Sequence, residues 1–128
     1  MRTHLAGWLM PLFVLSATSL VRASDVADAV MRGDTAALRA LIQKKADVNA
    51  RQVDGSTALH WAVYRGDIEA ADLLIRAGAN VRAATREDVT PLAMACLDGS
   101  MPMVERLLRA GADPQERGPN GETTLMYA

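Results

Sequence analysis

Two side chains in this sequence are of types that could do chemistry, a histidine and a cysteine. His60 is the only histidine after residue 4, and Cys96 is the only cysteine of the chain. A nucleophilic thiol needs a neighbouring base and a lowered pKa, and a metal site needs more than one protein ligand. The sequence shows no second ligand and no orienting third group. We therefore predict no metal site and no cofactor, and we keep a thiol-dependent protective role of Cys96 as an alternative.

Other signatures of catalysis or nucleic-acid binding are missing from the sequence. It contains no Gly-rich phosphate loop and no hydrolase nucleophile elbow. Asp25, Asp28 and Asp34 precede or begin apolar helical patterns, where carboxylates stabilise helix starts. The formal charge is −1, and no run of Lys or Arg could form a phosphate-binding stripe. We expect no enzymatic activity, no small-molecule substrate and no nucleic-acid partner.

The elements that position these residues repeat along the chain. The stretch Thr57–Ala62, Thr-Ala-Leu-His-Trp-Ala, returns 33 residues later as Thr90–Ala95 and again as Thr123–Ala128. Further residues keep the same 33-residue step, namely Gly33, Gly66 and Gly99; Leu41, Leu74 and Leu107; and Ala46, Ala79 and Ala112. A fixed period of this size indicates one structural unit that is laid down repeatedly.

The period and its residues resemble the ankyrin repeat, whose units read approximately G-x-T-P-L-H-x-A-A and later L-L-x-x-G-A-D-V-N-A. Here Gly55–Ala62 and Leu73–Val81 follow this pattern, as do Thr90–Leu92 and Leu107–Asp113 in the next copy. The resemblance implies an all-α fold, an ankyrin-repeat solenoid of stacked antiparallel helix pairs joined by β-hairpin-like loops, here called fingers. It also implies that His60 ties a helix start to the neighbouring finger.

The resemblance divides the chain into repeats that begin after residue 23. We expect an ankyrin-repeat domain over 24–128, with a degenerate capping repeat 24–53, repeats two (54–86) and three (87–119), and a truncated repeat 120–128. The ending inside a repeat suggests a fragment of a longer protein. The first two fingers should span Val48–Ser56 and Val81–Val89. The helices should span Thr35–Lys45, Thr57–Arg65, Ile68–Ala77, Thr90–Leu97 and Met101–Ala110.

Residues 1–23 have the pattern of a secretory signal peptide. Arg2 precedes an apolar stretch from Leu5 to Val21, and Val21-Arg22-Ala23 fits a cleavage site before Ser24. The stretch is shorter than the about 20 residues that a membrane anchor needs. We predict an exported protein without membrane contact after cleavage, periplasmic in a Gram-negative bacterium and otherwise secreted.

Two turn positions depart from the repeat pattern. Lys45 stands where repeats two and three have Gly78 and Gly111, and Asp88 stands where the first finger has Gly55. Glycine at such turns usually permits a left-handed backbone. We expect these turns to be strained or different. Trp61, Met94, Met101 and Met103 occur at helical spacing, and we expect them to pack between repeats.

The remaining candidate site is a surface. Fingers and first helices of stacked repeats line one concave face, and packing does not explain the residue types found there. The resemblance implies a non-catalytic module that binds a protein partner through this face. A targeting or inhibitory domain of a longer protein is the alternative. The predicted binding residues are Val53, Asp54, Ser56, Tyr64, Arg65, Arg86, Glu87, Val89, Leu97 and Asp98.

Overall fold

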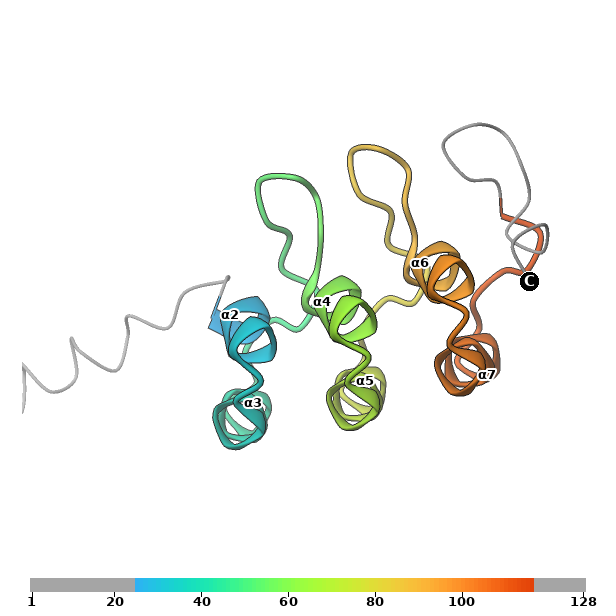
Figure 1. The fold of residues 1–128 in the computed structure, drawn as a ribbon. Coiled ribbons are helices and arrows are strands. Elements are labelled where there is room, and N and C mark those ends of the chain that lie inside the picture. Colours follow the sequence, from blue (N-terminus) through green and yellow to red (C-terminus); the bar gives the residue numbers. More distant parts are fainter. Residues whose placement is uncertain (1–24, 117–128) are drawn as a thin grey trace, which may run out of the picture.

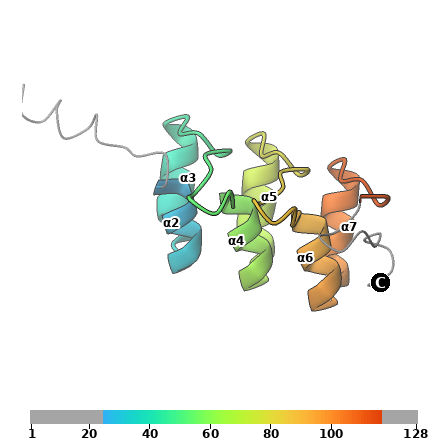
Figure 2. The same cartoon turned by 90° about the horizontal axis from the view of Figure 1, so that it is seen from above.

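The computed structural model describes residues 25–116, in which six helices form three antiparallel pairs. Helices α2 (Asp25–Arg32), α4 (Ala58–Arg65) and α6 (Pro91–Asp98) form one row. Their partners α3 (Thr35–Gln43), α5 (Ile68–Arg76) and α7 (Met101–Arg109) form a second row beneath it (Figure 1). Seen from above, the pairs follow one another in sequence order (Figure 2). The predicted all-α, pairwise-stacked fold is confirmed, while the expected signal peptide and truncated repeat lie outside the described residues.

Polar side chains and glycines determine where the helices begin and end. Asp34 and Asp67 each accept a hydrogen bond at 3.0 Å from a backbone N–H in the first turn of the following helix. Such caps satisfy donors that have no partner within the helix. Gly66 and Gly99 end α4 and α6 with left-handed φ angles of 66° and 70°. The predicted helix bounds therefore agree with the structure to within two residues.

The core lies between the two rows of helices and between successive pairs. Leu74 of α5 and Leu107 of α7, 33 positions apart, are completely buried. Many of the other buried positions on the helices are alanines, whose small side chains allow close helix packing. Met103 is buried as predicted, but Met101 is 59% exposed because it occupies the outward face of the first turn of α7. Met101 therefore does not pack between repeats.

The two departures from the repeat pattern keep the backbone geometry of the glycines that they replace. Lys45 has φ 59°, and the equivalent Gly78 and Gly111 have φ 96° and 104°. Asp88 has φ 61°, against 84° for Gly55. The turns therefore keep their shape, and the residues with a Cβ occupy a strained region of backbone space.

The first two fingers are tight turns rather than strands, and each is closed by the same backbone hydrogen bonds. Gln52 N donates to Ser56 O at 2.8 Å, and the equivalent Thr85 N donates to Val89 O at 3.0 Å. Side chains then join each repeat to the next at the base of the fingers. Asn49 Nδ2 donates to Gly78 O at 3.1 Å, and Arg82 Nε donates to Gly111 O at 2.9 Å.

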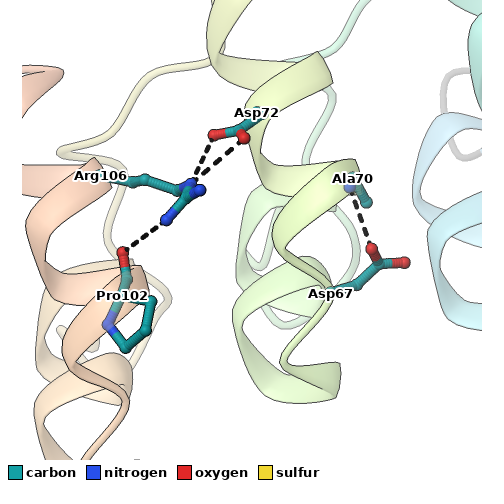
Figure 3. A network of polar contacts seen from close by, with 5 residues as sticks. All are labelled: Asp67, Ala70, Asp72, Pro102 and Arg106. Carbon is teal, nitrogen blue, oxygen red and sulfur yellow. Dashed lines mark hydrogen bonds and ion pairs between the residues drawn. The ribbon is translucent and has the colours of Figure 1, made fainter.

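On the α3–α5–α7 side, ion pairs connect successive second helices. Arg106 Nε lies 3.0 Å from Asp72 Oδ1 and 3.2 Å from Oδ2, and Arg106 Nη1 donates to Pro102 O (Figure 3). Arg39 pairs with Glu69 between α3 and α5. These side chains are partly or largely exposed, so each pair contributes little to stability. Within residues 25–116, none of the helices has the length and apolar character required to cross a membrane.

Candidate functional site

A groove of about 560 Å³ lies between the first two fingers, over helix α4. The fingers extend from the α2–α4–α6 row, away from the second helices (Figure 1). Two groups of residues line it: Asp54, Ser56, Thr85, Arg86, Glu87 and Val89 from the fingers, and His60, Trp61, Tyr64 and Met94 from α4 and α6. Its volume falls within the range of ordinary ligand-binding clefts.

An aromatic pair forms the part of the groove that α4 contributes. The rings of Trp61 and Tyr64 meet edge to face, with centroids 5.8 Å apart and planes at 83°. Trp61 Nε1 donates a 2.7 Å hydrogen bond to Gln52 Oε1, which fixes the indole against the first finger. Tyr64 is 68% exposed. The fixed indole and exposed phenol ring provide a preorganised aromatic surface.

Asp54 and Ser56 stabilise the tip of the first finger. Asp54 Oδ1 accepts hydrogen bonds from Ser56 N at 2.9 Å and from Ser56 Oγ at 2.6 Å. These bonds, the side-chain one first, hold the pKa of Asp54 below its usual range. The Asp54 carboxylate is therefore charged at neutral pH. Ser56 lines the groove but is only 5% exposed, so its main role is in the turn.

His60 joins the start of α4 to the second finger. Thr57 N donates to His60 Nδ1 at 3.1 Å, so the ring proton is on Nε2, which donates to Val89 O at 3.0 Å. The imidazole is 2% exposed. Burial lowers its pKa, although the hydrogen bond to Val89 opposes this shift. His60 is therefore neutral at pH 7, in the tether that the family resemblance implied.

Backbone contacts hold the two fingers at a fixed distance. Arg86 N donates to Asp54 O at 3.0 Å, and Arg51 Nη1 donates to Ala84 O at 2.8 Å. A Cβ at Gly55 would lie only 2.9 Å from Arg86 N, so this approach requires glycine. The groove walls are thus linked by one main-chain hydrogen bond and by the side chains of Arg51 and His60.

Six of the ten predicted binding residues line the groove, and four do not. Val53 and Leu97 are 84% and 62% exposed, and Asp98 is exposed at the end of α6. Arg65 turns toward the first repeat, where its Nη1 donates to Met31 O at 3.0 Å. Sequence reasoning did not include four lining residues in the site, His60, Trp61, Thr85 and Met94. The 33-residue step from Gln52 to Thr85 was a signal for one of them, because both close their fingers.

Cys96 does not have the environment of a reactive thiol. It is 6% exposed on α6, and burial first, then the negative charge of Glu116, raises its pKa. A thiol-dependent function requires access and a lowered pKa. Within the described part of the chain, no three His, Cys, Asp or Glu side chains are grouped so that they could hold a metal ion. The groove, in contrast, presents aromatic, apolar and charged side chains that can contact a binding partner.

Comparison with known protein families agrees with this geometry. Two family models match the chain, both described as ankyrin repeats (many copies), one over residues 26–75 and the other over residues 74–128. Their boundary falls within α5, so together they cover all three helix pairs. No curated protein matches the chain.

Proposed function

This chain belongs to the ankyrin-repeat family, whose members typically serve as protein-binding modules, and we propose that it is a non-catalytic module that binds a protein partner through the groove between its first two fingers. The observation that supports this most strongly is the Trp61–Tyr64 pair at the centre of the groove. Trp and Tyr are enriched among the few residues that supply most of the binding energy at interfaces. An exposed Tyr64 beside a fixed indole has no evident role in the core.

The rigidity of the groove also supports binding. The fingers are joined by Arg86 N–Asp54 O, His60 ties α4 to the second finger, and the indole is held by Gln52. A preformed surface loses less conformational freedom when a partner binds than a loose surface does. The buried, unreactive Cys96 supports the non-catalytic assignment, as does His60, whose two ring nitrogens are both engaged in buried hydrogen bonds.

The binding experiment compares two pairs of exposed side chains in the full-length chain. The first pair, Tyr64→Ala with Leu97→Ala, removes one side chain that lines the groove and one that is exposed near the end of α6. The second pair, Met101→Ala with Leu108→Ala, removes exposed apolar side chains of α7. Partners are captured from exported proteins of the source cells, and their affinity is measured. We expect the first pair to weaken binding at least about fivefold, corresponding to about 1 kcal/mol, with an unchanged melting temperature. Loss of binding only in the α7 pair would overturn the proposal.

We also propose that the protein is exported and that its signal peptide ends at Ala23. The support is the sequence pattern of Arg2, the apolar stretch and Val21-Arg22-Ala23. N-terminal sequencing of the exported product should begin at Ser24. Recovery of the protein from the cytosol with Met1 intact would contradict this proposal.

A further inference from the structure

An apolar ladder crosses the three repeats beside the groove. Met31, Tyr64 and Leu97 are spaced by 33 residues, and each is the second-last residue of its helix, in α2, α4 and α6. They are 38%, 68% and 62% exposed, respectively. Three large apolar side chains at one repeat position form a regular line on the surface rather than a scatter of single exposed groups.

The middle of this ladder carries the charges of the groove. Two carboxylates, Asp54 and Glu87, and one guanidinium, Arg86, line the groove, so its formal charge is −1. His60 adds no charge, because it is buried and neutral. The ladder also lies at the C-terminal ends of three helices, where the backbone carries partial negative charge. At α2 the guanidinium of Arg65 binds Met31 O and offsets that charge. Arg65 does not line the groove, so on the groove side of Tyr64 a cation is favoured over an anion by Asp54 and Glu87, and an aromatic face attracts cations further.

The spacing of the ladder selects the shape of the occupant. Packed helices lie about 8–10 Å apart, so side chains at one position of successive first helices are separated by about that distance. A polyproline II segment has three residues per turn and rises 3.1 Å per residue, so every third side chain returns to one face after about 9 Å. A β-strand does not match as well, because its side chains alternate between faces.

We propose that the groove and ladder bind an extended, polyproline II-like segment of a protein partner. Its central Lys or Arg lies against Trp61 and Tyr64, and apolar side chains three residues before and after it contact Met31 and Leu97. This inference rests on the proposed binding function of the groove and specifies the chemistry of the partner.

The probe is a seven-residue peptide, blocked at both ends, with leucine first and last, arginine in the centre and proline elsewhere. The chain has two tryptophans, so in a full-length Trp8→Phe protein the fluorescence reports Trp61 alone. We expect the arginine peptide to bind about three- to tenfold more tightly than the same peptide with central glutamate. Moving each leucine one residue closer to the arginine should also weaken binding. Added salt should weaken it further, since the groove charges are exposed.

Charge variants test the sign of the interaction, because the groove carries neighbouring residues of opposite charge. Glu87→Gln should weaken arginine-peptide binding about two- to fivefold, and Arg86→Gln should strengthen it by a similar factor. Glu105→Gln, which removes an exposed carboxylate of α7, is the matched control and should have no effect. Leu97→Ser should weaken binding, whereas Leu108→Ser on α7 should not.

The outcomes separate this inference from the proposed function. Equal or tighter binding of the glutamate peptide overturns the inference, as does an unchanged Trp61 signal with every peptide at millimolar concentration. Dependence on Glu105 or Leu108 instead of Glu87 and Leu97 also overturns it. If protein capture still requires Tyr64 and Leu97 in those cases, the groove binds a partner of different chemistry. If capture is indifferent to both residues, the proposed function itself fails.

Discussion

Repeats two and three begin their first helices with the same Thr-x-Leu sequence, but they connect those helices to the next finger differently. In repeat two, the buried imidazole of His60 accepts from Thr57 N and donates to Val89 O. In repeat three, Ala93 occupies that position, and Thr90 Oγ1 accepts from Ala93 N while its hydroxyl donates to Glu116.

The difference shows that the repeat specifies a junction rather than a particular side chain. One junction uses a neutral ring in a dry environment, and the other uses a hydroxyl and a carboxylate. Only the first titrates through a histidine, and only the first forms a wall of the groove. His60 therefore holds one wall of the groove in place, whereas the equivalent Ala93 has no such function.

The largest effect on stability is expected from truncating the equivalent core leucines of the two repeats. Leu74→Ala and Leu107→Ala should each lower the free energy of unfolding by about 2–5 kcal/mol, because both side chains are fully buried. Leu74 should be at the upper end, since α5 contacts both α3 and α7. Urea denaturation measures both. Leu108→Ala, at 39% exposure, is the control; an effect below about 0.5 kcal/mol at Leu107 would refute the predicted packing.

The next largest effect is expected from substitutions that remove each junction separately. His60→Ala should destabilise the protein by about 2–4 kcal/mol, because it leaves a cavity and removes the partners of Thr57 N and Val89 O. Thr90→Ala should cost about 1–2 kcal/mol, the usual effect of losing a helix cap. Chemical denaturation of the two variants checks the order. Equal losses would mean that the two junctions are energetically equivalent.

Acid should distinguish the same junctions without mutation. Burial lowers the pKa of folded His60, so the unfolded chain binds this proton at a higher pH than the folded chain does. The stability that the neutral ring supports is complete above the unfolded pKa of about 6.5 and is lost as pH falls from there toward the folded pKa. The slope is at most about 1.4 kcal/mol per pH unit. Denaturation between pH 7.5 and 5.5 should show this slope in the native chain and a flatter profile in His60→Gln.

The smallest effect concerns the turns that end the second helices. Lys45→Gly should stabilise the protein by about 0.5–1 kcal/mol, because glycine removes the cost of φ 59° but loses more entropy on folding. Gly78→Lys should destabilise it by at least the same amount. Thermal denaturation measures both shifts. A destabilised Lys45→Gly protein would show that the lysine side chain contributes more than its strained backbone costs.

The helices were predictable because their signals are local and repeat three times. The apolar pattern, the Asp34 and Asp67 caps and the glycines at 66 and 99 all lie within a few residues of the helix ends that they determine. The left-handed turns at Lys45 and Asp88 were also predictable. Lys45 aligns with Gly78 and Gly111, Asp88 aligns with Gly55, and all of these residues have a positive φ.

The site was predictable only in part, because the direction of a long side chain depends on neighbours distant in sequence. Arg65 was expected at the binding face, but its guanidinium contacts a carbonyl 34 residues earlier. Trp61 packs against the core as predicted, but its hydrogen bond to Gln52, which fixes the indole in the groove, could not be read from the repeat spacing. The burial of Ser56 likewise follows from the shape of the finger. Repeat position identified the region, and tertiary contacts decided which side chains face it.

The side-chain links at the base of the fingers have a consequence for how such genes can change. Asn49 and Arg82 each bind the carbonyl of a turn glycine 29 residues further on. A substitution within the intervening stretch leaves that spacing intact, whereas a single-codon insertion or deletion shifts the carbonyl out of reach. Recombination that adds or removes one complete 33-residue unit preserves every such spacing. The array is thus open to duplication of whole units and intolerant of shorter in-frame insertions and deletions, so it can lengthen by repeats while its surface diverges residue by residue.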